Sequence, residues 1–258
     1  MKKYTYIPLL LLILSLLFSS CSTVTGSKET KLQDEASAGI PFPYVALSKR
    51  FEDPNLGSYA KENLDSFSTT VLANGIPVII KKNPANRVFS VKTVFMGHTM
   101  FTPVEKAGLE AITLEMLIRG STSYSYEDVL KLLYETSSSI YAQTGSYDTT
   151  SFDLNTLDQY FERLFPVYLD LLLNPRWDEK EFGQVVNDFN IVLSRSMADP
   201  YAEAVRRLHA DMFEGHPYAA EPGGTEASLK AITRNDVMNY YTRLLSPERM
   251  FIVAVGNF

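Results

Sequence analysis

Apolar and polar positions change their pattern near residue 66 and so divide the chain into two parts. Residues 7–18 are almost all apolar, and residues 22–65 are polar and interrupted by prolines. Beyond them, short alternating runs typical of strands are followed by longer runs with helical spacing. The pattern therefore predicts a folded domain over residues 66–258, preceded by a segment that buries little apolar surface.

The strand-like and helix-like runs of this domain alternate in a definite order. Ala73-Asn74-Gly75 supplies a tight turn between the first two strands, and Ser125 with Asp128 is typical of a helix start. Strands are predicted over residues 67–72, 76–82, 88–96, 139–144, 148–154 and 250–255. Helices are predicted over residues 104–118, 125–136, 157–173, 178–197 and 233–245, with one more starting at Pro200. This order predicts an α+β fold, a mostly antiparallel sheet packed on one side by helices.

The amino-terminal pattern predicts export. Lys2 and Lys3 precede the apolar run, and Ser19-Ser20 precedes Cys21, the single cysteine of the chain. A basic start, a short apolar core and small residues are typical of a signal peptide, here residues 1–20. The cysteine after small residues resembles the bacterial lipobox, which implies acylation of Cys21 and a lipid-anchored tether over residues 21–65. An ordinary cleaved signal with a chance cysteine is the alternative.

Charge and cysteine content exclude several classes of protein. Acidic residues number 30 and basic residues 24, a formal net charge of −6. This balance argues against nucleic-acid partners and against a polybasic contact with lipid, so membrane attachment would rest on acyl chains. A single cysteine permits no internal disulfide, and the domain must be stabilised by its core.

The segment from Gly108 to Ser121 carries a family resemblance. It reads G-L-E-A-I-T-L-E-M-L-I-R-G-S and resembles the pitrilysin/insulinase zinc metallopeptidases, whose motif runs roughly G-L-A-H-F-L-E-H-M-L-F-K-G-T. The positions in step are Gly108, Leu109, Met116, Leu117, Gly120 and Ser121. The L-x-N-G-I opening and the V-x-V-G-N-F ending at Phe258 extend the resemblance over residues 66–258, which implies the fold of one amino-terminal domain of that family.

The same comparison implies that the zinc chemistry is lost. In the inverted H-x-x-E-H motif two histidines bind zinc and the glutamate activates water. Those positions read Ala111, Glu115 and Leu114 here, and the family's third ligand, a glutamate of a later helix, corresponds to Val192. Glu110 projects away from Glu115 on a helix, so both acids are expected to be solvated or locally paired. No catalytic residue, metal ligand or cofactor is therefore predicted.

Other candidate groups are weaker. His98, His209 and His216 are not spaced for a metal site, because Gly215 and Pro217 interrupt any helix at the last of them. Several tyrosines are candidates for a peptide groove, but core packing is the favoured interpretation. They are Tyr124, Tyr126, Tyr134, Tyr141 and Tyr147.

Three functions compete at this point. The first is a non-catalytic lipoprotein of the bacterial cell envelope that pairs with a zinc-bearing homologous subunit or second domain and contacts extended peptides. The second is an active zinc metallopeptidase with atypical ligands that include Glu115. The third is a surface or periplasmic lipoprotein that binds peptides or other ligands without a peptidase partner.

Overall fold

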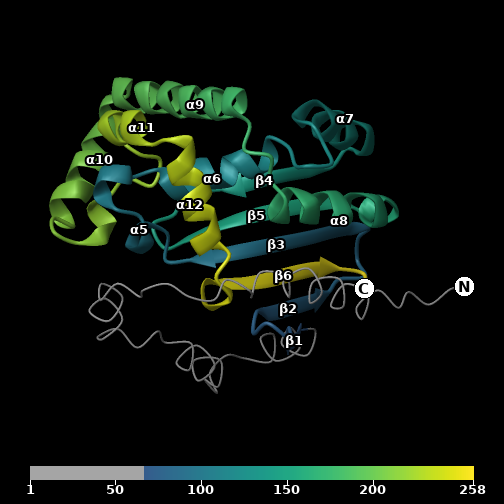
Figure 1. The fold of residues 1–258 in the computed structure, drawn as a ribbon. Helices are drawn as coiled ribbons and strands as arrows, with labels where there is room; N and C mark the ends of the chain where they lie inside the picture. The colour runs from purple at the N-terminus through teal and green to yellow at the C-terminus, as the bar shows by residue number, and fades with distance from the viewer. Residues whose placement is uncertain (1–66) are drawn as a thin grey trace, which may run out of the picture.

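The strand-like runs assemble into one six-stranded sheet with the order β1-β2-β6-β3-β5-β4. The computed structural model describes residues 67–258 (Figure 1). The predicted signal peptide over residues 1–20, the lipidation site Cys21 and the tether over residues 21–65 lie outside the described residues. The strands are β1 (Phe67–Val71), β2 (Pro77–Lys82), β3 (Val88–Met96), β4 (Ser139–Gln143), β5 (Thr149–Leu157) and β6 (Met250–Gly256).

Strand pairing is antiparallel at every step except one. β2 and β6 run parallel, with Val78 opposite Ile252, while β6 also pairs antiparallel with β3. The predicted turn closes the first hairpin, where the Leu72 nitrogen donates to the Ile76 oxygen at 2.9 Å. The expected α+β class with a mostly antiparallel sheet is confirmed.

Helices cover one face of this sheet (Figure 1). The longer helices are α6 (Leu109–Ile118), α7 (Tyr126–Thr136), α8 (Asp158–Leu173), α9 (Glu179–Ala198), α10 (Pro200–Met212) and α12 (Arg234–Leu244). Short helical segments are α5 (His98–Phe101), η2 (Val104–Lys106), η3 (Pro217–Ala219), α11 (Glu226–Ala231) and η4 (Pro247–Arg249). None of the helices between residues 67 and 258 combines the length and apolar character that a membrane span requires.

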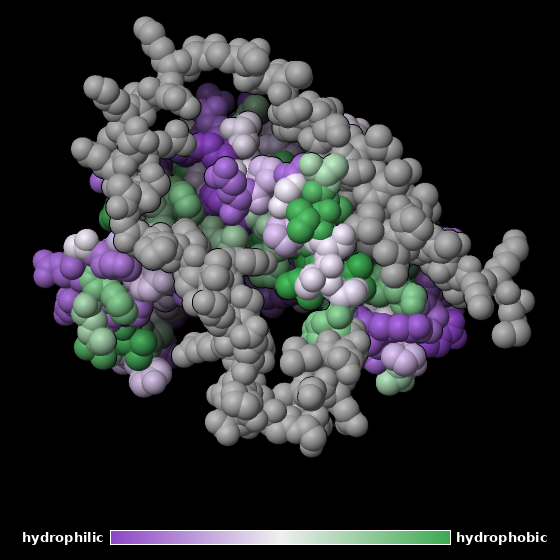
Figure 2. Space-filling model, turned by 90° about the horizontal axis from the view of Figure 1, so that it is seen from below, coloured by the Kyte–Doolittle hydropathy of each residue, from purple (hydrophilic) through white to green (hydrophobic). Residues whose placement is uncertain are grey.

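The two faces of the sheet differ because side chains alternate along each strand. On β3, Val91 and Phe95 are buried beneath the helices, whereas Lys92 and Val94 point to the other side. We call this second side the open face. Seen from below, the parts of the molecule that remain in view carry hydrophilic and hydrophobic residues side by side (Figure 2).

Several predicted boundaries are wrong, each for a local reason. The helix expected over residues 104–118 is divided: η2 ends before Gly108, and α6 begins at Leu109. The strand expected to end at residue 154 continues to Leu157, because β5 pairs with β3 along its whole length. The short helices α5 and α11 were not predicted, since neither carries a run long enough to show helical periodicity.

Candidate functional site

Helix α6 contains the segment that resembles the zinc motif, and it lies within the core. Eight of its ten residues are buried, which indicates a helix surrounded by protein on nearly all sides. Ala111 and Leu114 are both 0% exposed. The side chains of Ala111 and Leu114 are therefore hydrocarbon groups packed in the protein interior.

Two glycines lie at the ends of this helix, where the backbone packs too closely for a side chain. Gly108 has a φ of 90°, and a Cβ there would lie 3.0 Å from the Cα of Gly224. Gly120 has a φ of 116°, and a Cβ there would lie 2.9 Å from the Tyr124 oxygen. Any side chain at either position would collide with backbone, so these glycines serve packing.

Glu115 lies at the side of α6 that faces α9. Burial raises the pKa of its carboxyl group; the charge of Arg119 opposes this effect and that of Asp188 adds to it. Arg119 donates from Nη2 to Asp188 Oδ2 at 2.9 Å, and its Nη1 lies 3.8 Å from Glu181 Oε2. An arginine, with its fixed positive charge, thus joins the two helices at this place.

Val192 belongs to the outer surface of α9. Its side chain is 66% exposed, and that of the neighbouring Ile191 is 43% exposed. A valine side chain has no atom that can bind a metal ion. Within residues 67–258, no three His, Cys, Asp or Glu side chains come together in a way that could hold a metal ion.

The histidines have packing roles, and His209 and His216 both belong to an aromatic cluster around Phe213. His98 is 1% exposed, and its Nδ1 lies 2.5 Å from the Ser146 oxygen. His209 stacks on Tyr147 with ring centroids 4.2 Å apart, and His216 Nδ1 accepts a hydrogen bond from the Tyr218 nitrogen at 3.2 Å. Their geometry orders loops around the end of the sheet.

Among the candidate tyrosines, the outcome differs by residue. Tyr124 packs against the core, whereas Tyr134 is 88% exposed on α7. Tyr141 accepts a hydrogen bond from Asn155 on the open face at 3.2 Å. The five tyrosines do not share one surface or one role.

Glu110 corrects the expectation for the acidic pair of the motif helix. Its side chain is 0% exposed, so it is neither solvated nor locally paired. Arg249 Nη2 donates to Glu110 Oε2 at 2.9 Å, and Thr150 Oγ1 donates to Glu110 Oε1 at 2.6 Å. Tyr240 also donates its hydroxyl to Glu110, and burial raises the pKa of that tyrosine. The partners are distant in sequence, and the only local signal was a carboxylate inside an apolar run.

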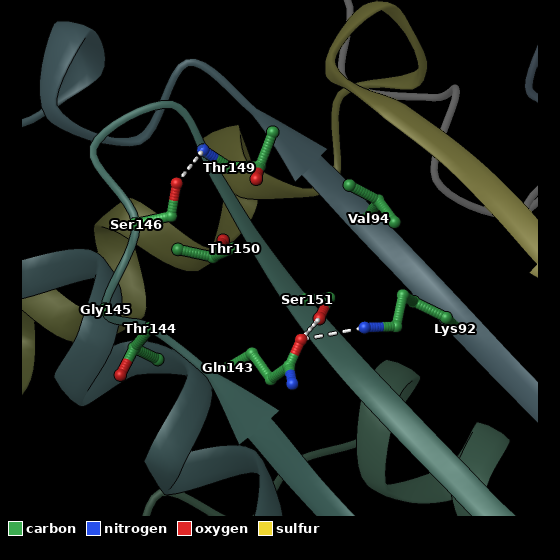
Figure 3. Close-up of a pocket in the computed structure, with 9 residues that line it drawn as sticks. All are labelled: Lys92, Val94, Gln143, Thr144, Gly145, Ser146, Thr149, Thr150 and Ser151. Carbon is green, nitrogen blue, oxygen red and sulfur yellow. Dashed lines mark hydrogen bonds between the residues drawn. The ribbon is translucent and has the colours of Figure 1, made fainter.

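A polar cavity of about 460 Å³ on the open face was also missed (Figure 3). It lies where β3, β5 and the end of β4 meet the loop between β4 and β5. Its lining residues are Lys92, Val94, Gln143, Thr144, Gly145, Ser146, Thr149, Thr150 and Ser151. Strand alternation alone could have indicated that Lys92 and Ser151 point outward, but not that the register places them together.

Comparisons with known proteins agree with this fold. No family model matches the chain. The chain is 24% identical over 191 residues to a probable mitochondrial-processing peptidase subunit beta from Arabidopsis thaliana, covering 72% of this chain and 35% of the relative. It is 20% identical over 182 residues to the non-peptidase homolog YmxG from Helicobacter pylori, covering 70% of this chain and 42% of the relative. The chain thus spans less than half the length of these relatives.

The solved structures lead to the same class. An inactive domain of a peptidase M16 from Pseudomonas fluorescens superimposes with a TM-score of 0.68 at 17% identity, covering 74% of this chain and 47% of that chain. The relatives and structural neighbours are M16, pitrilysin-like peptidases, and they include inactive ones. The domain fold that the sequence resemblance implied is confirmed.

Proposed function

We propose that this chain is a lipid-anchored, non-catalytic domain of the M16 type that pairs with a zinc-bearing homologous subunit or domain and provides surface for extended peptides. The observation that carries the proposal is the position of the motif residues. A catalytic zinc needs three ligands that converge on an open coordination position. Ala111 and Leu114 are sealed in the core, while Val192 lies in solvent on α9.

An exposed apolar stripe on α10 supports association with a partner. Its side chains are spaced four, three and four residues apart, which places them on one helix face. They are Tyr201, Val205, Leu208 and Met212, which are 79%, 47%, 59% and 69% exposed. Contiguous apolar surface of this kind marks interaction sites, and the relatives are longer than this chain. A homologous domain is the partner that we assign to this stripe.

The free edge of the sheet supports peptide binding. Strand β4 forms one end of the strand order, so its outer backbone groups pair with no other strand of residues 67–258. An extended peptide adds to such an edge through main-chain hydrogen bonds, with alternate side chains directed to each face. A domain without catalytic ligands can thus still hold a peptide for its partner.

Anchoring in the bacterial cell envelope is the part of the proposal that rests on the sequence alone. The basic start, the apolar run and Cys21 support export and acylation. The intact mass of the mature protein tests it: acylation predicts a chain that begins at Cys21 and carries the mass of its acyl groups. A mature chain that begins elsewhere, without added lipid mass, would contradict the anchor.

Metal content and co-purification test the central proposal. We expect purified protein to contain far less than one zinc per chain and to co-purify with a homologue that has an intact H-x-x-E-H motif. The double variant Val205→Glu, Leu208→Glu should lose that partner, because it places charges in the apolar stripe. Tyr134→Glu on α7 is the control, since it places a charge at a large side chain elsewhere that is even more exposed, at 88%.

Two results would overturn the proposal. A monomer without any homologous peptidase in its complexes would remove the partner role. One zinc per chain with peptide cleavage, both abolished by Glu115→Ala, would establish the active peptidase instead.

A further inference from the structure

The cavity on the open face has a lining with one charge. Among its lining residues Lys92 is the one with a charged side chain, and the others provide hydroxyl, amide or backbone groups together with one valine side chain. A volume of about 460 Å³ is in the range of small-ligand sites, about 300–1,000 Å³. A cavity with a single ammonium group and no lining carboxylate is suited to an anion.

Contacts with Asp153 and Gln143 hold the ammonium group of Lys92 in place. Its Nζ lies 2.9 Å from Asp153 Oδ2 and donates to Gln143 Oε1 at 2.8 Å. Asp153 is 1% exposed and is not among the cavity's lining residues, so its carboxylate pairs with the ammonium without forming part of the cavity wall. The contact with Asp153 is an ion pair in which the carboxylate oxygens accept no hydrogen bond from residues 67–258, so the hydrogen bond to Gln143 is the one that occupies an ammonium proton and further protons can face a ligand.

Two further lining side chains, those of Gln143 and Ser146, have free donor capacity. Because Lys92 has no acceptor, the Oε1 atom of Gln143 must face it, which leaves the Nε2 amide protons of Gln143 unused. The Ser146 hydroxyl accepts from the nitrogens of Asp148 and Thr149 and keeps its own proton. Figure 3 shows the amide oxygen of Gln143 between the Lys92 ammonium and the Ser151 hydroxyl, with Ser146 farther along the cavity, near Thr149.

The loop that closes the cavity is anchored and therefore preorganised. His98 Nδ1 contacts the Ser146 oxygen at 2.5 Å, and Thr99 Oγ1 donates to the Tyr147 oxygen at 3.0 Å. The Gly97 nitrogen donates to the Asp148 oxygen at 2.6 Å. Donor groups fixed in this way lose little entropy when a ligand binds.

The position of the cavity relates it to the sheet edge. Gln143 is the last residue of β4, and neighbouring strands lie about 4.8 Å apart. A strand added beside β4 would direct every second side chain over the open face, next to Gln143. We infer that this cavity binds the carboxylate of a peptide paired with β4, either an aspartate or glutamate side chain or the C-terminal carboxylate. This inference rests on the proposed function in its peptide-binding part.

Fluorescence anisotropy with labelled peptides tests the inference on the whole purified chain. The probes are alternating valine–threonine hexapeptides with one central glutamate or glutamine and an amidated C-terminus, and the glutamine peptide with a free C-terminal carboxylate. One carboxylate peptide should bind about tenfold more tightly than the amidated glutamine peptide, because hydrogen bonds to charged groups contribute most. The peptide that gains affinity identifies the source of the carboxylate.

Three variants locate the effect. Lys92→Met should abolish the preference for a carboxylate, and Asp153→Asn should strengthen it, because Asp153 no longer offsets the lysine charge. Lys81→Met is the matched control: it removes a lysine from the same face on β2 and should leave the preference unchanged. Circular dichroism confirms that each variant is folded, and Asp153→Asn keeps the test valid if Lys92→Met unfolds.

A second measurement separates this inference from the proposed function. NMR titration with N-acetylglutamate N-methylamide should shift the side-chain amide of Gln143 in the absence of any peptide. If no peptide binds but this shift occurs, peptide binding fails and the anion site stands. The inference is overturned if peptides bind with equal affinity and Gln143 does not shift. It is also overturned if a further probe, the amidated hexapeptide with a central arginine, binds more tightly than the glutamate peptide.

Discussion

At position 111 a methyl group fills a space that solvent does not reach. Restoring the histidine of the resembled motif would therefore overfill the core and bury an imidazole without a partner. We expect Ala111→His to lower the free energy of unfolding by about 1–3 kcal/mol, measured by urea denaturation. Val192→Glu, which restores the third ligand on an exposed surface, should change it by less than about 0.5 kcal/mol.

Equal stability of these two variants would mean that position 111 still has room for a ligand. The contrast is informative because both substitutions return the chain toward the resembled motif. Only the environment differs, with Ala111 at 0% and Val192 at 66% exposure.

The raised pKa of Glu115 predicts how the stability of the fold depends on pH. Its pKa in the folded chain is raised above 4.5 by burial, so folding favours its protonated form. Its contribution to stability is complete below pH 4.5 and is lost as the pH rises through the folded pKa. Glu115→Gln stays neutral, so the stability of this variant relative to the unmodified chain should increase between pH 4 and pH 7.

Glu203 provides a control of opposite sign for the same urea titrations. Hydrogen bonds from Arg206 and Arg207 lower its pKa to about 2, and its contribution is lost as the pH falls. The Glu203→Gln variant should therefore be less stable than the unmodified chain at pH 7. The difference in their free energies of unfolding should shrink toward low pH. A relative stability of Glu115→Gln that does not change with pH would show that Glu115 is not desolvated.

Among the elements, α6 depends on the turn that precedes it. Gly108→Ala forces a side chain onto a φ of 90° and against the backbone of Gly223 and Gly224. We expect a loss of about 1–3 kcal/mol in the free energy of unfolding. Gly183→Ala is the control. Gly183 lies in the middle of α9 on its exposed side, with nothing within 4 Å of an added Cβ, so the substitution should raise the free energy of unfolding by about 0.5–1 kcal/mol. If Gly108→Ala does not lower the free energy of unfolding, the backbone at Gly108 does not pack as closely against Gly223 and Gly224 as the structure shows.

Local signals predicted the elements well because their causes are local. The capping box of Ser125 and Asp128 starts α7, and the equivalent pair Thr233 and Asp236 starts α12. The divided helix before Gly108 was missed because its cause is the contact with Gly224, more than a hundred residues later. Elements therefore follow from neighbouring residues, and their interruptions follow from the tertiary structure.

Sites were predicted less completely for the same reason. That Ala111 and Leu114 lack ligand atoms can be read from the sequence, whereas their burial cannot. Glu110 was expected to be solvated or locally paired, and its buried partners could not be predicted because Thr150, Tyr240 and Arg249 are 40, 130 and 139 residues away. The cavity around Lys92 required the strand register, which no short motif reveals.

For the whole molecule, the buried Glu110 joins α6 to β5, α12 and the segment before β6. Glu110→Gln would leave the Arg249 guanidinium buried without its counter-charge, and we expect a loss of about 3–5 kcal/mol. The double variant Glu110→Gln, Arg249→Met should be more stable than the sum of the two single losses predicts. Additive losses in urea denaturation would show that the two side chains act independently.

The place of β6 in the sheet also determines when the domain can form. The strand completed last, ending at Gly256, lies between β2 and β3, and β2 reaches the rest of the sheet through it. When the domain folds, the first hairpin can form early, yet it has no docking place until β6 has joined the sheet. A chain that ends before Met250 therefore carries an unattached hairpin and an open gap in its sheet, a target for chaperones and proteases.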